Sequence, residues 1–421
     1  MRSPVPEYLQ EILDACAGND AGAVADYIPE LAAADPEPFA LAMCTPDGTV
    51  YSAGDASRRF TLQSLSKPFV YALALRDHGA ERVEEAVDME PSGDAFNEIS
   101  LDPDTGRPEN PMINIGAITT HTLVGDPDLP GRERAERIIA GLGEFAGRDL
   151  EVDDAVRSSE LATSWRNQAL ANLVKANGIL QGDPYEAVAG YTRQCAVLAD
   201  VRDLAVMAMT LGSGGVNPLT GRQVVPEPVA RQVLAVMTTC GMYDAAGDWL
   251  TAVGIPAKSG VSGGLLGVLP GQVGLGAYSP RLDAFGHSVR GVEAFERLSE
   301  DMGLHIMRAP APSIDMIGRR SRTRDGRRLV ALQGALTFPV AEMALRHFEA
   351  IEPGDDDVVV DFTLVPRMAD VGVRMIGEGL ERLSADGHDV ILVDPHGRIP
   401  DAVTEEDYIA RVVDEQAELR R

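Results

Sequence analysis

The sequence predicts a mixed α/β (α+β) protein, in which one antiparallel sheet carries terminal helices and a helical lobe, and a small α/β domain follows. Strand patterns occur near residues 39–52 and again near 263–278, and the long block between them is periodic at helical spacing. Beyond about residue 325, strand and helix patterns alternate. Strands at both ends of the first 300 or so residues pair most simply in one sheet, which leaves the middle block as a separate lobe.

The first elements after a helical start are a hairpin and a helix. Residues 39–44 and 49–52 flank the turn sequence Pro46-Asp47-Gly48, which is typical of a hairpin. From residue 64 to 75, apolar residues recur at helical spacing, and Ser64 can open that helix. Ser64 and Lys67 would then lie on one helical face.

The middle block, from about residue 130 to 245, supplies few strands. It is followed by strand patterns, a tight turn at Pro270-Gly271 and a last helix. The expected helices of the block cover 134–142, 160–176, 184–199 and 226–239, the later strands cover 251–256, 263–269 and 273–278, and the last helix covers 288–302.

A proline-rich stretch and a run of arginines at residues 307–324 predict a linker between a large domain over 1–306 and a small one over 325–421. In the small domain, alternation predicts at least partly parallel strands. Its expected elements are a strand up to Leu336, a helix over 340–350, a strand over 358–362, a helix over 369–383 and a strand over 389–393.

Composition narrows the class of function. With 45% hydrophobic and 24% charged residues, the chain can bury a substantial core, and its net charge of -28 argues against nucleic-acid or anionic-membrane partners. No apolar signal core or membrane-length apolar run is seen, so a cytoplasmic location is expected. The four cysteines are widely spaced, which favours reduced structural thiols over disulfides or a zinc site. No metal and no cofactor are expected.

The chain has only three lysines, and two lie in Ser64-x-x-Lys67 and Lys258-Ser259-Gly260. A serine needs a base, and no histidine lies in a hydrolase motif, so lysine is the remaining candidate. Ser64 is therefore a candidate nucleophile and Lys67 its base, with Lys258 as a supporting charge that lowers the pKa of Lys67. The alternative for Lys67 is a solvated helix residue, which is also the expectation for Lys175.

Lys258-Ser259-Gly260, just before a glycine-rich strand, resembles the third motif of the serine β-lactamase and penicillin-binding protein superfamily. The Ser-Asp-Asn element of that superfamily is not evident. Further stretches, in order from about residue 10 to 305, closely resemble the β-lactamase-fold glutaminases. They are Tyr27-Ile-Pro-Glu-Leu31, Gln63-Ser-Leu-Ser-Lys67, Glu90-Pro-Ser-Gly93, Asn110-Pro-Met-Ile-Asn114, Cys240-Gly-Met-Tyr243-Asp244 and Pro256-Ala-Lys-Ser-Gly-Val261.

This resemblance implies hydrolysis of L-glutamine to L-glutamate and ammonia through a Ser64 acyl-enzyme. Free glutamine is a zwitterion, so its site needs a carboxylate for the ammonium group and donors for the carboxylate. The family positions imply Glu160 for the first, and Asn114, Asn167 and Tyr191 for the second. The implied catalytic residues are Ser64, Lys67, Tyr243 and Tyr27, and the implied substrate-binding residues are Ser64, Asn114, Glu160, Asn167, Tyr191, Tyr243 and Val261, with the N–H groups of Ser64 and Val261 holding the oxyanion.

The same residues have structural alternatives. Glu160 and Asn167 lie seven apart, which also describes a solvated stripe on one helical face. Tyr243 could be a core tyrosine and Asn114 a turn residue. For the whole chain, the rival classes are a penicillin-recognising serine acylase and a non-enzymatic signalling scaffold, while asparagine is the nearest competing substrate because it differs from glutamine by one methylene.

The last 97 or so residues resemble a STAS domain in element order and in the motif Asp361-Phe362-Thr363. Thr363 stands where that family often has a phosphorylatable residue, so phosphorylation at a helix start could alter docking onto the catalytic domain or a protein partner. The alternative is an unmodified helix cap. The glutaminase resemblance also suggests a homo-oligomer, a dimer or a tetramer.

Overall fold

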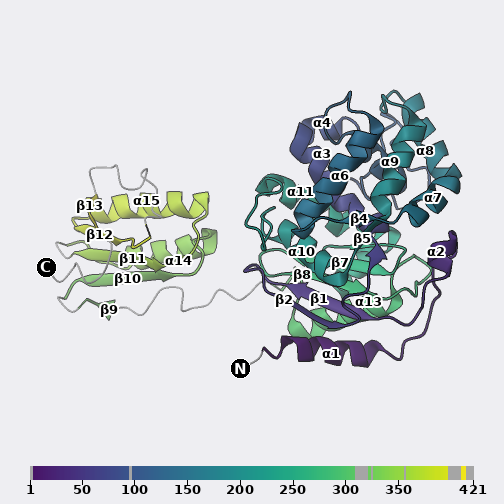
Figure 1. Ribbon diagram of the computed structural model, residues 1–421. Coiled ribbons are helices and arrows are strands. Elements are labelled where there is room, and N and C mark those ends of the chain that lie inside the picture. The colour runs from purple at the N-terminus through teal and green to yellow at the C-terminus, as the bar shows by residue number, and fades with distance from the viewer. Residues whose placement is uncertain are drawn as a thin grey trace. The chain divides into compact units, whose positions relative to one another are not determined.

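The computed structural model describes residues 3–93, 97–308, 321–323, 326–354, 357–396 and 409–413. The chain divides into two compact units, Met1–Arg308 and Ala309–Arg421 (Figure 1). Of the expected linker 307–324, only residues 307–308 and 321–323 fall within the described residues. Among the described residues, no helix has the length and apolar content needed to cross a membrane.

The first unit contains a five-stranded sheet in which every neighbouring pair is antiparallel. N-terminal and C-terminal strands meet within it, with Ala42 opposite Gly276, as the strand patterns predict. The order is β2 (Val50–Gly54), β1 (Ala40–Cys44), β8 (Val273–Tyr278), β7 (Gly264–Leu269) and β6 (Ala257–Ser259).

Alternation along the strands gives this sheet two apolar faces. One face packs against α1 (Val5–Cys16) and α13 (Val289–Met302), and the other packs against α10 (Val201–Gly212) (Figure 1). Glycine at Gly274 allows the close approach of α10, because a Cβ there would lie 2.3 Å from the carbonyl oxygen of Ala205.

The helical lobe is built around α3 (Lys67–His78), whose first nine residues are all buried. A helix with this burial belongs in a core, and α4 (Ala80–Glu84), α5 (Asn114–Thr122), α6 (Gly131–Ala146) and α11 (Glu227–Cys240) pack against it (Figure 1). A second group, α7 (Asp154–Ala162), α8 (Trp165–Ala176) and α9 (Pro184–Cys195), packs together, and α8 and α9 also contact α5. The lobe also holds a small sheet of β3 (Phe60–Thr61), β5 (Val197–Ala199) and β4 (Glu151–Val152).

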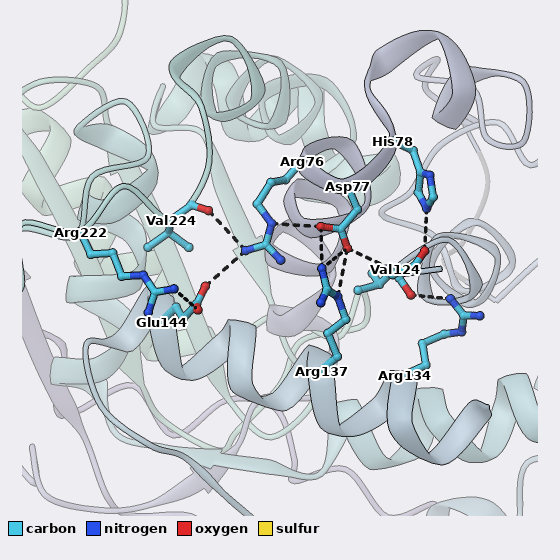
Figure 2. Close-up of polar contacts among 10 residues, drawn as sticks. Arg76, Asp77, His78, Val124, Arg134, Arg137, Glu144, Arg222 and Val224 are labelled. Atoms are coloured by element: carbon cyan, nitrogen blue, oxygen red, sulfur yellow. Dashed lines mark hydrogen bonds and ion pairs between the residues drawn. The ribbon is translucent and has the colours of Figure 1, made fainter. Parts of the chain in front are cut away.

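Ion pairs tie the end of α3 to α6 within this lobe, as Figure 2 shows. The Asp77 carboxylate accepts hydrogen bonds from Arg76 and from Arg137 of α6. The Glu144 carboxylate, also on α6, lies 3.3 Å from Arg76 and 2.8 Å from Arg222. The two helices therefore form one electrostatically cross-linked layer, and the carboxylates in it are already paired.

The expected single helix over 160–176 is wrong, because the chain forms α7 and α8 with a break at residues 163–164. The Ser164 hydroxyl donates to the carbonyl of Leu161 at 2.7 Å, a local bond that competes with the helical ladder. Glu160 and Asn167 consequently lie on different helices rather than on one face. The expected helix 184–199 is also too long, because its last three residues form β5.

The expected strand over 251–256 is wrong as well. Helix α12 (Ala246–Ala252) occupies its first part, and the Trp249 indole N–H donates to the carbonyl of Ile255 at 2.7 Å and holds the following loop. The strand begins at Ala257, so Lys258 lies inside β6 and not after a strand. Ser64 does not open a helix either: residues Gln63–Ser66 form a 3-10 turn (η1), here named the serine turn, and α3 begins at Lys67.

The second unit is a five-stranded sheet of β13 (Ile409–Val413), β12 (Val390–Val393), β11 (Val358–Leu364), β10 (Arg328–Gln333) and β9 (Ser321–Arg322). Its strands β10 to β13 are parallel and β9 is antiparallel, as alternation predicts in part. Helices α14 (Phe338–Glu349) and α15 (Asp370–Ala385) share one core with it. Thr363 lies in β11 and not at a helix start, and its hydroxyl donates to Asp361.

Candidate active site

The serine turn joins β3 to α3 and holds Ser64 at the edge of a pocket. Gln63, next to Ser64, has a φ of 50°, and Tyr243 has a φ of 55°. They are the two non-glycine residues with positive φ in the described part of the chain, and Tyr243 forms a hydrogen bond with Ser64. Sparsely populated backbone conformations persist where the surroundings enforce them, which is common at functional sites.

Lys67 is the first residue of α3 and is 1% exposed. Its amine donates to the carbonyl of Met112 at 3.0 Å and to Asn114 Oδ1 at 2.8 Å. Burial lowers the pKa of Lys67 to about 7, because the charged form loses its hydration. Near neutral pH this lysine is therefore able to exchange a proton.

Lys258, in β6, is fully buried behind Tyr243. Its amine lies 3.9 Å from the centroid of the Tyr243 ring and donates to the carbonyl of Ser259 at 2.9 Å. Burial holds the pKa of Lys258 well below its usual range, and the nearby charge of Lys67 adds to this effect. Both causes favour the neutral form of this amine.

A pocket of about 370 Å³ opens beside Ser64, and Glu160 lies in its wall. The Tyr27 hydroxyl donates to the Glu160 carboxylate at 2.7 Å, and burial raises the pKa of Glu160. A carboxylate in this setting gains from a cationic partner, which restores the charge that burial disfavours. The Tyr27 hydroxyl thus satisfies one oxygen of the Glu160 carboxylate in the pocket.

Three amide and hydroxyl side chains from separate helices meet in the same pocket. Asn114 begins α5, Asn167 belongs to α8 and Tyr191 to α9. The Asn114 amide donates to Asn167 Oδ1 at 3.1 Å, and the Tyr191 hydroxyl donates to Asn114 Oδ1 at 3.4 Å. Because Asn114 also accepts from Lys67, one residue links the pocket wall to the buried lysine.

Val261 reaches the pocket from the loop between β6 and β7. Gly260 allows this loop to lie against the serine turn, because a Cβ there would be 2.9 Å from the carbonyl oxygen of Leu62. The Ser64 N–H is in the first turn of η1, where backbone donors have no partner within the helix. Ser64 and Val261 therefore belong to two segments that meet at this pocket.

The structure brings together the residues that the sequence singles out. Tyr27, Ser64, Asn114, Glu160, Asn167, Tyr191 and Val261 line the pocket, while Lys67, Lys258 and Tyr243 lie behind it. Sequence reasoning does not assign six further lining residues to the site, although Gln63 begins one of the quoted motifs and several others are neighbours of predicted residues. They are Gln63, Asn97, Thr163, Ser164, Arg166 and Cys195.

The mixed α/β fold and this pocket define an enzyme for a small polar substrate. A family model described as Glutaminase matches residues 22–307. Glutaminases of Corynebacterium efficiens and Corynebacterium glutamicum are 48% and 47% identical to the chain, and the alignments cover 94% of this chain and 94% and 96% of theirs. The chain belongs to the glutaminase family, and it is an enzyme of that class.

Solved structures agree with this assignment. The crystal structure of Mglu matches with a TM-score of 0.89 at 47% identity and covers 94% of this chain and all of that one. Mglu in its glutamate form matches with a TM-score of 0.88 at 44% identity. A Bacillus glutaminase solved in 4.3 M NaCl covers 72% of this chain with a TM-score of 0.65 at 32% identity.

Proposed function

We propose that the enzyme hydrolyses L-glutamine to L-glutamate and ammonia through an acyl-enzyme on Ser64, with Lys67 as the base. The observation that carries this proposal is the environment of Lys67. A neutral amine has two N–H donors and one lone pair, and both donors are engaged by Met112 and Asn114. The lone pair is then the remaining group for the Ser64 proton, in a side chain whose pKa is lowered to about 7.

The reaction follows in two halves. Lys67 accepts the hydroxyl proton as Ser64 Oγ attacks the γ-carboxamide carbon, and the N–H groups of Ser64 and Val261 stabilise the oxyanion. The C–N bond breaks, and the proton from Lys67 passes by way of Tyr243 to the leaving nitrogen, so that ammonia departs. Water then attacks the ester, returns a proton through Lys67 and releases L-glutamate. Tyr243 suits the relay because it bonds Ser64 and lies against both lysines.

Substrate recognition rests on complementary charge and hydrogen bonding. Glu160 takes the α-ammonium group, and burial makes that pairing stronger than it would be in water. Asn114, Asn167 and Tyr191 cluster in the same pocket and offer donors to the α-carboxylate. The crystal structure of Mglu in its glutamate form supports the same ligand class for this fold.

Ser64→Ala tests the nucleophile. We expect ammonia release from glutamine to fall by at least about a thousandfold, because only the binding and oxyanion groups remain. Lys67→Arg should be nearly as damaging, since arginine stays protonated, while Lys175→Arg is the matched control on an exposed helix end. Activity of the Ser64→Ala protein near that of the wild type would overturn the assignment.

For the second unit, we infer a STAS-like regulatory domain. Support comes from its alternating strands and helices and from the position of Thr363, exposed at the end of β11. Because Thr363 bonds Asp361, phosphorylation would place two anionic groups together and disturb this corner. A homo-oligomer, side activity on asparagine and a protein partner for this domain stay predictions.

A further inference from the structure

A second cavity lies in the helical lobe and shares no lining residue with the pocket beside Ser64. It is found where the ends of α3 and α5 meet the beginnings of α6 and α9, and its volume is about 230 Å³. Drug-sized ligands usually occupy ~300 to 1,000 Å³, so this cavity suits a smaller metabolite.

One wall of the cavity carries a buried positive charge. Arg134 is 6% exposed, and its guanidinium donates to four backbone carbonyls, among them that of Val124 in Figure 2. Among the described residues, no carboxylate forms an ion pair with Arg134, and Asp77, in the same view, is paired with Arg76 and Arg137. The carboxylate of Asp126 acts on Arg134 electrostatically without forming an ion pair, so an anionic group in the cavity would give this buried guanidinium a direct partner.

The cavity also has acidic and apolar lining residues. Glu186, in the first turn of α9, lines the cavity, and its carboxylate reaches Gly131 at the beginning of α6. Leu123, Leu129 and Leu180 are among the apolar lining residues. A cation, an apolar wall and an anion in one small cavity complement a zwitterionic amino acid with an apolar side chain.

A continuous chain of hydrogen bonds leads from this cavity to the serine turn. His121 lines the cavity, and its Nδ1 lies 2.9 Å from Gln194 Oε1. The Gln194 amide donates to Ser66 Oγ at 2.9 Å, and Ser66 donates to the carbonyl of Gln63 at 2.8 Å. Burial lowers the pKa of His121 to about 4, so the ring is neutral and Nδ1 can donate its hydrogen to Gln194.

We propose that this cavity is a regulatory site for a small amino acid with an apolar side chain, and that its occupancy reaches the serine turn through His121, Gln194 and Ser66. Ser66 stands between Ser64 and Lys67, so a shift of its hydroxyl changes the geometry on both sides. The binding part of this proposal is independent of the proposed mechanism, whereas the regulatory part rests on the catalytic role of the serine turn.

Calorimetric titration of the full chain with L-leucine tests binding, with saturating L-glutamate present to fill the pocket beside Ser64. We expect L-leucine to bind, and 4-methylpentanoate and 3-methylbutylamine, which each lack one charge, to bind at least about tenfold more weakly. Absence of binding by L-leucine, L-isoleucine and L-methionine would overturn the proposal. So would L-leucine binding that L-glutamate abolishes.

Two variants locate the site. Ala187→Leu fills the cavity and should weaken L-leucine binding at least about tenfold, whereas Ala176→Leu, on the exposed end of α8, should not. Glu186→Gln keeps the exposed position and the shape, so it should weaken L-leucine but leave 4-methylpentanoate unchanged. Unchanged L-leucine binding in the Glu186→Gln protein would contradict a pairing of Glu186 with the ammonium group of the ligand, even if the Ala187→Leu protein fails to fold.

Glutamine turnover with and without saturating L-leucine tests the regulatory part. We expect L-leucine to change kcat at least about twofold in the wild type, and Gln194→Met to abolish that change while keeping L-leucine affinity. A wild-type kcat that L-leucine leaves unchanged overturns the regulation, and an effect that survives Gln194→Met overturns the route. Failure of the Ser64 mechanism would appear separately, as turnover by Ser64→Ala.

Discussion

At the residue scale, the lysine base makes the rate depend on pH. The neutral form of Lys67 is the active one, and its pKa is lowered to about 7. As the pH falls below this value the amine is protonated, so kcat/KM should fall about tenfold per pH unit, and it should level off above it. A pH profile from about pH 5 to about pH 8 checks this sign, and a flat profile would contradict a titrating Lys67.

Asn114 gives a sharper test because it contacts Lys67 directly. Asn114→Asp places a carboxylate beside the Lys67 amine, which favours the protonated amine. The pKa that governs the fall of kcat/KM at low pH, here called the acid limb, should therefore rise by about one pH unit or more. Asn167→Asp is the control: it adds the same charge to the same pocket, but Asn167 contacts Asn114. Both variants should raise KM, and an equal shift of the acid limb in both would show that contact with Lys67 is not the cause.

Lys258 should reveal a conflict between stability and activity. Its buried amine has a lowered pKa and no carboxylate partner among the described residues, so Lys258→Met removes a desolvation cost and should raise the free energy of unfolding by about 1 kcal/mol. Activity should fall at least about tenfold, because Tyr243 loses the buried amine that packs against its ring.

Urea denaturation and ammonia release measure the two effects. Lys175→Met, on an exposed helix end, should leave both within error. If the free energy of unfolding of the Lys258→Met protein fell by several kcal/mol instead, Lys258 would be a charged and well-paired group.

At the element scale, the close contact between the β6–β7 loop and the serine turn depends on Gly260. An alanine there would bring Cβ within 2.9 Å of Leu62 O and 3.0 Å of Leu65 Cγ, so the loop carrying Val261 must move. Gly260→Ala should lower kcat/KM at least about tenfold through the displaced oxyanion donor.

The matched control for that variant is Gly247→Ala. Gly247 lies in α12 with open space around its Cβ, so alanine should stabilise the helix by about 0.5 to 1 kcal/mol and leave kinetics unchanged. Wild-type kinetics in the Gly260→Ala protein would show that the loop does not need this contact.

Sequence patterns predict elements well where apolar periodicity matches the final packing. The strand expected over 273–278 is found at those residues, because both of its faces are buried and glycine admits α10. Prediction fails where side chains override periodicity. Ser164 breaks a helix by bonding Leu161, and the Trp249 indole holds a loop where a strand is expected.

Some residues of the candidate site can likewise be predicted from sequence patterns, and others cannot. Lysine scarcity and motif spacing identify Ser64, Lys67 and Lys258, because serine chemistry without histidine needs such a base. Spacing puts Glu160 and Asn167 on one helical face, but the break between α7 and α8 is what places them around one pocket. Arg166 and Cys195 join the pocket only through tertiary packing, which a single sequence does not encode visibly.

At the scale of the whole molecule, the first unit should work alone. It contains the pocket, both buried lysines and its own cores, and the family model matches within it at residues 22–307. A protein of residues 1–308 should fold and keep a kcat within about threefold of the full chain.

Circular dichroism checks that the shortened protein folds, and ammonia release checks its activity. A loss of more than about tenfold in a folded protein would show that the second unit takes part in catalysis. A truncated protein with normal turnover would assign that unit a role outside the chemical step.

The burial of two of the three lysines has a practical consequence for attaching the enzyme to surfaces and dyes. Amine-reactive esters need an exposed amine, and Lys67 and Lys258 are 1% and 0% exposed, whereas Lys175 is exposed at the end of α8. Acylation of the native protein should therefore modify one lysine side chain and spare the pocket. Of the three lysine side chains, Lys175 is therefore the one through which the enzyme can be attached without modifying Lys67 or Lys258.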